Sequence, residues 1–357
     1  MKPIRVLLIG PSPDIVGGQS VQAARLLDRL GAEPTLEMRF LPINPRLPGP
    51  FRRLQKIKYV RTAATSLLYG TRLMGAIWRC DILHIFTAAY FSFLLAPAPA
   101  ILLAKLLGKK TILNYRDGQA EDHLANWRTA VPVIKLVDAV VTPSGFLVKV
   151  FDKFGLRARS IFNVIDTGRF RYRERAHPRP VFLHNRGHEP LYNVECTLRA
   201  FALIQERYPN ARLTVVHDGP LRGKLEVLAR ELHLRNVQFT GYVSQQQTPE
   251  VYDEADIYLT SPNIDNMPGS LLECFAAGLP VIATKAGGIP YILEDERTGL
   301  LVECNDHQAM AERAFRLMEE DGLALKLTRY AREECGKYTP DAVGREWLGL
   351  YRELRGE

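Results

Sequence analysis

The sequence predicts an α/β fold made of two doubly wound domains, and three observations support this prediction. The chain has 357 residues, which is long for one hydrophobic core and typical of two domains. Short apolar runs alternate with longer amphipathic runs, as in parallel sheets whose strands are joined by helices. Apolar residues make up 46% of the chain and charged residues 24%, which is typical of folded globular proteins.

The first domain is expected over residues 1–167. Short apolar runs predict buried strands at Ile4–Ile9, Glu37–Leu41, Ile82–Phe86, Thr111–Tyr115, Ala139–Thr142 and Ile161–Val164. Amphipathic runs predict helices at Gln19–Leu30, Leu54–Arg79, Phe91–Leu107, Glu121–Leu136 and Ser144–Phe154. The uncharged run Ile85–Ala104 contains Pro97 and Pro99, so we interpret it as a strand and a helix rather than a membrane span.

The second domain, residues 181–339, repeats this scheme. Its predicted strands are Val181–His184, Leu213–Val216, Val237–Thr240, Ile257–Thr260, Val281–Ala283 and Gly299–Val302. Its predicted helices are Val194–Tyr208, Leu221–Leu232, Ser270–Ala277, His307–Glu320 and Leu323–Lys337.

Two further segments complete the predicted organisation. The Arg- and Pro-rich residues 168–180 show no period and are the predicted linker. Residues 340–357, with the helix Pro340–Arg355, are expected to pack back onto the first domain. Doubly wound sheets bind ligands at the carboxyl ends of their strands, so the two domains are expected to face a cleft.

Positive charge is concentrated in the first half of the chain. Residues 1–180 contain 28 Lys and Arg against 12 Asp and Glu, whereas residues 181–357 contain 19 against 27. This asymmetry predicts an anionic partner. Between Arg52 and Arg61 basic residues alternate with apolar ones, as in a segment that lies on an anionic membrane surface. A solvated helix face explains them equally well. No nucleic-acid-binding motif is present, so nucleic acid is not an expected partner.

The most informative stretch runs from Asp265 to Thr284. Asp265 and Glu273 lie eight residues apart, separated by a Pro-Gly turn, and Glu273 falls in the first turn of a predicted helix. Such a loop can offer a carboxylate to sugar hydroxyls and helix N–H groups to a phosphate. Ser270 to Glu273 also fits a capping box, which would give both residues a structural role. The whole string favours a nucleotide-sugar site.

Other strand ends carry residues suited to the same ligand. Gly17 and Gly18 follow the first strand and permit close approach of a ligand to the backbone, although a turn explains them alone. Arg186 follows the first strand of the second domain, where a guanidinium could neutralise a diphosphate. Residues 241–243 end another strand and offer an edge to a nucleobase or sugar.

A polar cluster follows the strand Thr111–Tyr115 of the first domain. It contains Arg116, Asp117 and His123, and the histidine could bind an acceptor or move a proton. Capping or surface roles are equally compatible with the acids of this cluster. His84, which ends the preceding strand, is expected to be a satisfied core group.

Together these residues resemble retaining GT-B glycosyltransferases of family 4 over nearly the whole chain. The resemblance is carried by Gly17-Gly18, Arg186, Asp218-Gly219-Pro220, Gly241-Tyr242-Val243, and the segment from Asp265 through Gly287-Gly288. It implies that Asp265 contacts the donor sugar and Glu273 the ribose. From the residues described above, we expect Asp265, Arg186 and Arg116 to act in catalysis, and His123 and Asp117 to bind the acceptor. The donor would be bound by Gly17, Gly18, Gly241, Tyr242, Val243, Asn266, Met267, Pro268, Gly269, Ser270, Leu271 and Glu273.

The resemblance also implies an activity. The chain would move a sugar from a nucleotide-sugar donor to a carbohydrate or lipid-linked acceptor, with retention and without a metal or other cofactor. Such an enzyme would work in polysaccharide or glycolipid assembly, in the cytoplasm or at the inner face of its membrane. A non-catalytic sugar-nucleotide-binding partner and a sugar-nucleotide epimerase of the same fold remain alternatives.

Three residues depart from the pattern of this family. The first acid is Asp265 rather than Glu, and the usual phosphate-binding Lys is replaced by Tyr192 or Asn193. Arg116 stands where the family has a histidine, and could supply the missing positive charge. These departures leave the catalytic competence of the site open.

Overall fold

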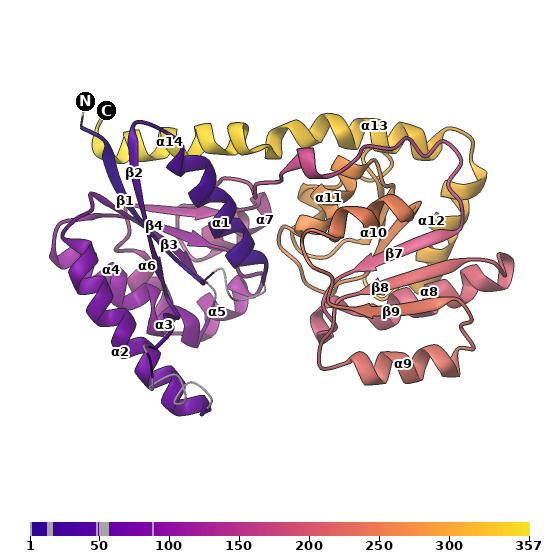
Figure 1. The fold of residues 1–357 in the computed structure, drawn as a ribbon, viewed down its shortest axis with the longest axis horizontal. Helices are drawn as coiled ribbons and strands as arrows, with labels where there is room; N and C mark the ends of the chain where they lie inside the picture. The colour runs from indigo at the N-terminus through magenta and orange to yellow at the C-terminus, as the bar shows by residue number, and fades with distance from the viewer. Residues whose placement is uncertain (1, 13–16, 48, 50–56, 88) are drawn as a thin grey trace. The chain divides into compact units, whose positions relative to one another are not determined.

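The computed structural model describes residues 2–12, 17–47, 49, 57–87 and 89–357, and it separates into two compact units (Figure 1). The first unit contains Met1–Val164 and Pro340–Glu357, and the second contains Ile165–Thr339. The chain therefore passes between the units twice, once after Val164 and once after Thr339.

The described part of the first unit contains a six-stranded parallel sheet in the order β2-β1-β3-β4-β5-β6. Its strands are β1 (Ile4–Gly10), β2 (Leu36–Pro42), β3 (Ile82–Thr87), β4 (Lys110–Tyr115), β5 (Ala139–Thr142) and β6 (Arg159–Ser160). The order reverses between β1 and β3, which makes their carboxyl ends the switch point of this sheet.

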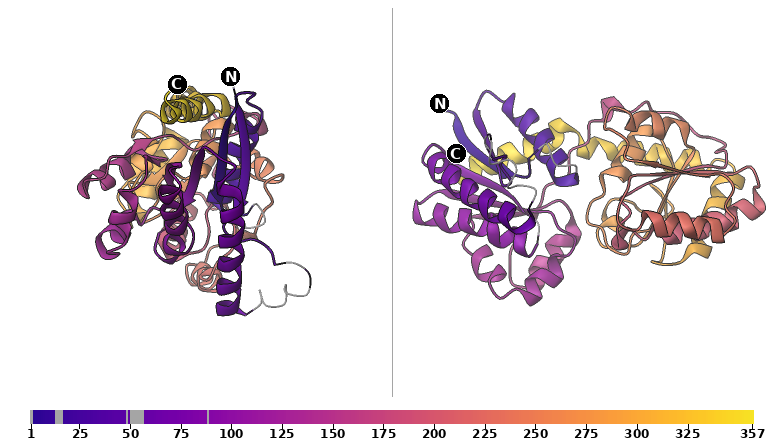
Figure 2. Two further views of the ribbon diagram at one scale, coloured as in Figure 1. Left: turned by 90° about the vertical axis from the view of Figure 1, so that its left-hand side faces the viewer. Right: turned by 60° about the horizontal axis from the view of Figure 1, so that its bottom comes forward.

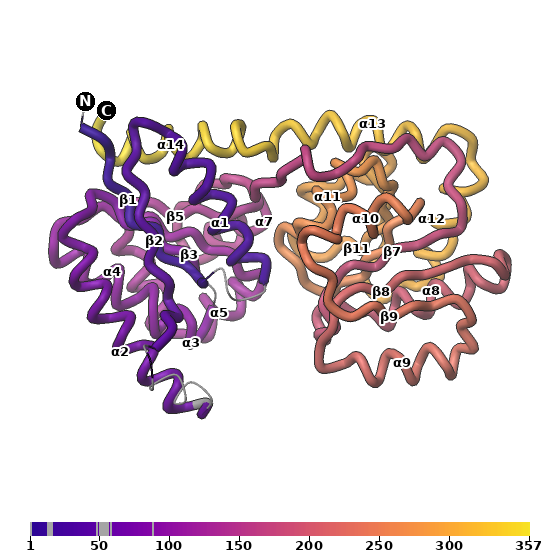
Figure 3. Tube along the Cα trace, in the orientation of Figure 1, coloured from indigo at the N-terminus to yellow at the C-terminus, as the bar shows by residue number. Residues whose placement is uncertain are grey.

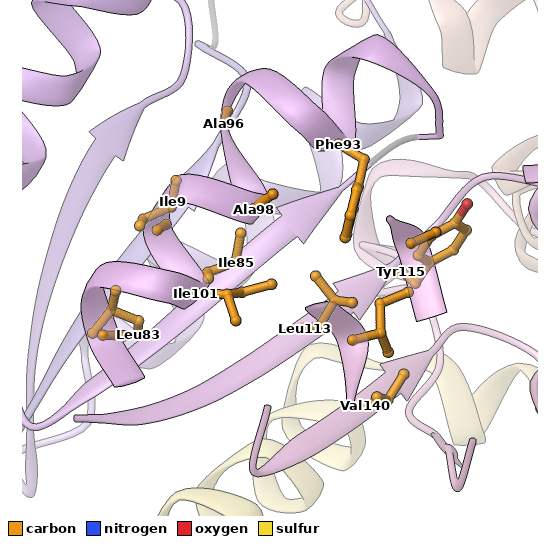
Figure 4. Packing of buried hydrophobic residues seen from close by; sticks show 14 of the residues in the cluster. Ile9, Leu83, Ile85, Phe93, Ala96, Ala98, Ile101, Leu113, Tyr115 and Val140 are labelled. Atoms are coloured by element: carbon orange, nitrogen blue, oxygen red, sulfur yellow. The ribbon is translucent and has the colours of Figure 1, made fainter. Parts of the chain in front are cut away.

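Helices cover both faces of this sheet, because its strands are apolar on both sides. One face packs against α1 (Gly18–Gly31) and α14 (Pro340–Arg355). The other face packs against α2 (Lys58–Ile77), α3 (Phe91–Leu95), α4 (Pro97–Leu106), α5 (Ala120–Asn126), α6 (Ala130–Ile134) and α7 (Gly145–Lys153). Figure 4 shows Phe93 and Ile101 of this helical layer beside Leu113 of β4.

A buried histidine helps to hold α14 on the sheet. His84 of β3 lies 2.7 Å from the Tyr351 hydroxyl through Nδ1 and 3.0 Å from the Asn114 amide through Nε2. Its ring lies against that of Trp347, with centroids 4.2 Å apart and a tilt of 31° between the planes. Burial lowers its pKa well below the ordinary value, so the ring is neutral. The prediction that His84 is a satisfied core group is confirmed.

The second unit contains another six-stranded parallel sheet, in the order β12-β11-β10-β7-β8-β9. Its strands are β7 (Val181–Asn185), β8 (Arg212–Val216), β9 (Val237–Gly241), β10 (Ile257–Thr260), β11 (Val281–Thr284) and β12 (Leu300–Val302). The order reverses between β7 and β10, so the carboxyl ends of these two strands form the switch point.

Helices also cover this sheet on both faces, as the tube in Figure 3 shows. α8 (Val194–Arg207), α9 (Arg222–Glu231), α12 (His307–Glu319) and the start of α13 (Leu323–Cys335) pack on one face. α10 (Thr248–Glu254) and α11 (Gly269–Ala277) cover the other, where Tyr252 stacks on Tyr258 of β10. Single 3₁₀ turns occur at Thr167–Arg169, Pro190–Tyr192, Ile289–Tyr291 and Gly336–Tyr338. The predicted fold class, two doubly wound α/β domains, is confirmed.

Prolines divide two helices that the sequence predicts as continuous. The predicted helix Phe91–Leu107 is α3 followed by α4, because Pro97 has no amide proton and restricts Ala96 before it. The predicted helix Glu121–Leu136 is α5 followed by α6, which has Pro132 in its first turn, where a missing N–H is tolerated.

Two other elements differ from the prediction. The last strand of the first sheet is Arg159–Ser160 rather than Ile161–Val164. The Gln22 amide exchanges two hydrogen bonds with the Val164 backbone, at 2.8 and 2.9 Å, and thus takes the place of a neighbouring strand. The short helix α10 was not predicted.

Residues 168–180, the predicted linker, lie within the second unit. The Arg175 side chain is fully buried there, and burial lowers its pKa to about 10. Its guanidinium donates to the carbonyls of Tyr252, Ala255 and Ala277 at 2.7–2.9 Å. The segment therefore fastens α10 to the end of α11.

We predict that Arg175→Leu destabilises the second unit by about 3–5 kcal/mol, because several buried carbonyls lose their donor. Urea-dependent hydrogen exchange of β10 and α11 amides measures this effect. Arg171→Leu is the matched control, since its side chain is 80% exposed. Equal unfolding midpoints for the two variants would contradict the structural role of Arg175.

Candidate functional site

The switch point of the second sheet brings Arg186 and Asp265 into contact. Arg186 follows β7, and Asp265 lies in the loop that follows β10. The Arg186 guanidinium donates a hydrogen bond to Oδ2 of Asp265 and forms an ion pair with it. The two side chains are only 14% and 11% exposed, so this pair is largely removed from water. Two residues that the sequence assigned to one site therefore share it.

Arg186 and Asp265 each favour the charged form of the other. Burial acts to lower the pKa of Arg186, but the Asp265 carboxylate outweighs it and the pKa lies above its ordinary value. Burial raises the pKa of Asp265, while Arg186 and the Asn266 amide, 2.8 Å from Oδ1, act in the opposite direction. The guanidinium is therefore charged, and its buried Nε has no acceptor among the described residues.

Glu273 is held by a chain of buried side chains rather than by its own helix. The Tyr252 hydroxyl donates to Oε2 of Glu273 at 2.9 Å, and the Asn185 amide donates to the same hydroxyl at 2.9 Å. Because Asn185 immediately precedes Arg186, these two hydrogen bonds fix the position of Glu273 relative to Arg186.

The capping-box interpretation of Ser270 and Glu273 is wrong. α11 begins at Gly269, its N-cap is Pro268, and no side chain caps it. Ser270 is therefore already a helical residue, whose hydroxyl interacts with Tyr258. The first N–H groups of α11 have no side-chain acceptor in the cap position, which is the arrangement that binds anions at helix N-termini.

The predicted donor-binding residues 266–271 differ in what they can offer a ligand. Asn266, Met267, Ser270 and Leu271 are each at most 7% exposed, so these side chains belong to the interior. Pro268 has no N–H group. This stretch can therefore contact a ligand mainly through its backbone.

Two glycines make room for the Asp265 loop. Gly288 donates its N–H to the Asp265 carbonyl at 2.9 Å. A Cβ on Gly287, which has a φ of +52°, would lie 2.2 Å from the Asp265 carbonyl oxygen. A Cβ on Gly288 would lie 1.8 Å from the Asn266 carbonyl oxygen. Any larger residue at either position would displace the loop that carries Asp265.

Residues 241–243 lie at the carboxyl edge of β8 and β9. His217 donates its N–H to the Gly241 carbonyl at 2.8 Å, and both residues have positive φ, +79° and +74°. Non-glycine residues in this conformation are uncommon and concentrate at functional sites. Tyr242 is 53% exposed, and its ring lies 6.0 Å from that of His217. This edge offers an aromatic face to a flat ligand.

Tyr192 and Asn193, one of which stands where the family has Lys, each have a structural role. The Tyr192 ring lies against the Arg186 guanidinium, 4.1 Å from its central carbon, in a cation–π contact. Asn193 adopts a left-handed conformation before α8, which favours Asn over long side chains. Tyr192 thus orients Arg186 without adding a charge.

The glycines of the first unit lie at the start of α1. Gly17 has an extended φ of 171° and Gly18 opens the helix, so neither needs the conformational freedom of glycine. A Cβ on either would meet no atom of the described residues within 4 Å. Close approach of a ligand is therefore a better explanation for these glycines than local packing.

Arg116 and Asp117, after β4, have different partners. Nη1 of Arg116 lies 3.3 Å from Asn114 Oδ1, while Nη2 is buried and meets no acceptor among the described residues. Burial lowers the pKa of Arg116 to about 9. Asp117 accepts the N–H groups of Ala89 and Gln119 at 3.1 and 2.9 Å, so its carboxylate joins two loops. Arg116 thus has an N–H group that could bind an anion, whereas both carboxylate oxygens of Asp117 already accept hydrogen bonds.

His123 lies in an aromatic enclosure. It is fully buried, its Nδ1 is 2.8 Å from the Tyr115 hydroxyl, and burial lowers its pKa. The rings of Tyr90, Phe93 and Trp127 surround it at 5.2–5.7 Å. An acceptor would meet Tyr90 or Trp127 before it met His123, because only these two of the three are partly exposed.

The supporting residues Asn185, Tyr252 and Tyr258 were missed by sequence reasoning. Asn185 adjoins Arg186 at a strand end, a position that could have marked it, but the two tyrosines carry no motif. No group of three or more His, Cys, Asp or Glu that could hold a metal ion occurs in the described ranges. All five cysteines are free thiols.

Known proteins resemble this chain in sequence. Residues 170–334 match the family "Glycosyl transferases group 1". The D-inositol 3-phosphate glycosyltransferase of Corynebacterium urealyticum is 31% identical over 166 residues, which cover 44% of this chain and 39% of that protein. The sulfoquinovosyl transferase SQD2 of Arabidopsis thaliana is 24% identical over 324 residues, 84% of this chain and 61% of that protein. The matches thus span less than two thirds of these relatives.

A solved structure resembles both units. Anabaena Alr3699/HepE in complex with UDP has a TM-score of 0.77 and 16% sequence identity, and the match covers 99% of this chain and 100% of that one. At this identity the likeness concerns the fold. The second unit therefore resembles the glycosyl transferases group 1 family in sequence, and the chain has the fold of GT-B glycosyltransferases.

Proposed function

We propose that the chain is a retaining glycosyltransferase whose second unit binds a nucleotide-sugar donor without a metal ion. The contact between Arg186 and Asp265 at the switch point carries this proposal. One is a cation suited to a diphosphate, and the other is a carboxylate suited to sugar hydroxyls. The relatives, whose names describe glycosyl and sulfoquinovosyl transfer, support the reaction class.

The donor would bind along the strand ends of the second unit. The uncapped N-terminus of α11 and Arg186 would hold the diphosphate, and Glu273 would accept hydrogen bonds from the ribose hydroxyls. The exposed ring of Tyr242 would lie against the base. These two fixed sources of positive potential would offset the diphosphate charge without a metal ion.

Transfer would proceed on one face of the sugar. The acceptor oxygen forms a bond to the anomeric carbon while the bond from that carbon to the diphosphate oxygen breaks. The proton of the acceptor hydroxyl passes to an oxygen of the departing diphosphate. Arg186 and the α11 amides stabilise the negative charge that develops there.

We assign acceptor binding to the first unit. Arg116 offers a buried N–H group to an anionic substituent, and the excess of Lys and Arg in residues 1–180 has the sign that attracts one. These features favour a phosphorylated carbohydrate or lipid-linked acceptor, as used in polysaccharide and glycolipid assembly. An anionic membrane surface would hold such an acceptor. Arg52, Arg53 and Lys56, which suggested membrane contact, lie outside the described residues.

We predict that Arg186→Lys slows turnover of the donor by more than tenfold, since the loss of one stabilising donor raises a barrier by about 2.7–4 kcal/mol. Release of nucleoside diphosphate from UDP-, GDP- and ADP-sugars measures the rate, with EDTA present to test metal independence. Arg199→Lys, in an exposed pair with Glu195, is the control. Rates within threefold of wild type would remove Arg186 from its assigned role. Sugar interconversion without acceptor would indicate an epimerase, and binding without turnover a non-catalytic partner.

We predict that Glu273→Gln weakens binding of the preferred nucleoside diphosphate about 10- to 100-fold, the effect of losing charge-assisted hydrogen bonds worth about 1.5–3 kcal/mol. Glutamine can still accept the Tyr252 hydrogen bond, so the fold is retained. Thermal shift with UDP, GDP and ADP provides the measurement, and Glu250→Gln on the exposed side of α10 is the control. The ribose assignment fails if both variants bind the nucleotide like wild type.

We predict that Gly288→Ala weakens nucleotide-sugar binding at least tenfold, because the new methyl group forces the Asp265–Asn266 backbone to move. Isothermal titration with the nucleotide sugar tests this. Gly223→Ala is the control, since a Cβ there meets nothing within 4 Å. Unchanged affinity in Gly288→Ala would show that the loop position does not matter for the donor.

A further inference from the structure

The outer side of α2 carries a continuous apolar stripe. Its inner side chains, Tyr69, Leu73 and Ile77, are at most 2% exposed and pack on the sheet. About 120° from them around the helix, Leu67, Met74 and Trp78, just after the helix, are 73%, 57% and 65% exposed. Spacings of seven and four residues align them along one helix face. The apolar stripe therefore faces away from the core that it would be expected to join.

α3 and α4 extend this apolar surface. Phe91, Leu102 and Leu106 are 67%, 51% and 81% exposed. The Tyr69 hydroxyl of α2 donates to the Ala96 carbonyl at 3.1 Å, and the inner sides of α2 and α4 share one core on the same face of the sheet. Figure 2 shows these two helices side by side. Their outer sides therefore form one surface, which we name the α2–α4 face.

The sequence that builds the α2–α4 face is mostly positive, although Asp122 of α5 accepts the hydroxyl of Tyr90, which adjoins Phe91. Between Glu37 and Asp117 the sequence contains 13 Lys and Arg but one acid, Asp81, and that acid is paired with Arg5 at 2.7 Å. Arg61, Arg72 and Arg79 are exposed and follow one another at spacings of 11 and 7 residues. At about 100° per residue Arg61 and Arg72 lie about 20° from each other, on the exposed flank of α2 that is more than about 100° from the apolar stripe, and Arg79 follows in the turn after the helix. Lys105 of α4 is also exposed.

We propose that the α2–α4 face docks onto an anionic lipid bilayer. Exposed Leu, Met, Trp and Phe side chains would enter the boundary between headgroups and acyl chains, while the arginines would contact lipid phosphates. A second copy of the chain fits less well, because two such faces would bring like charges together. The proposal concerns the first unit and does not depend on the proposed transfer reaction.

Sedimentation with phosphatidylcholine vesicles, with and without phosphatidylglycerol, tests the proposal. The wild-type chain should bind the anionic vesicles at low salt and release at high salt. Leu67→Glu with Met74→Glu should reduce this binding at least tenfold. The matched control is Val227→Glu with Tyr330→Glu, which adds the same charge at residues 43% and 40% exposed in the second unit. This control should bind like wild type.

Two further measurements separate the outcomes. Circular dichroism and the thermal shift with nucleoside diphosphate show whether the double variant is folded; if it is not, Arg61→Glu with Arg72→Glu replaces it. The proposal is overturned if wild type does not bind anionic vesicles, or if the folded variant binds as tightly as the control. It is also overturned if the wild type is a dimer that the variant dissociates while vesicle binding is absent, because the face then binds a second copy.

Discussion

The parallel pairing of β7 with β10 is the constraint on which the candidate site depends. These strands are separated by more than 70 residues, yet Ile257 pairs with Phe182 and Tyr258 with Leu183. Because the strand order reverses here, the connections that leave the two carboxyl ends turn to opposite faces of the sheet. The space left between them receives Arg186 from one strand and Asp265 from the loop after the other. Arg186 and Asp265 would not meet each other without this pairing.

Several buried contacts then hold the site in one geometry. The chain from Asn185 through Tyr252 to Glu273 connects the end of β7 to the first turns of α11. Gly288 holds the Asp265 loop through a hydrogen bond from its N–H to the Asp265 carbonyl. Arg175 fixes α10, which carries Tyr252, to the end of α11. Such preorganisation matters because a dry, fixed arrangement of charges stabilises developing charge better than one that must first reorganise.

The first unit has the same doubly wound architecture but carries different residues at its switch point and on its outer helices. Its switch point carries two glycines, and the buried Arg116 lies one strand beyond it, after β4. Its outer helices expose apolar and basic side chains where a soluble helix would expose mixed charges. Burying those side chains in the core would need a partner layer that the unit does not have. The anionic lipid surface proposed above would accommodate the apolar side chains in its interior boundary and the exposed arginines at its phosphates.

The sequence by itself determined the fold class, most strand positions, and the identity of Asp265, Glu273 and Arg186 as candidates. It could do so because apolar periodicity, turn residues and helix caps act between neighbours along the chain. It erred at Ala96, where the helix break that the adjacent Pro97 causes is local but was not used, and at Val164, where the distant Gln22 replaces a strand.

Only the tertiary structure decided which candidates share a site. It brought together Arg186 and Asp265, 79 residues apart, and gave Glu273 a tyrosine partner in place of the capping role that its sequence also allowed. It likewise enclosed His123 among aromatic rings and engaged Asp117 with backbone amides. The physical reason is that strand order, burial and the partners of a polar group depend on contacts between distant segments, and no local pattern encodes these.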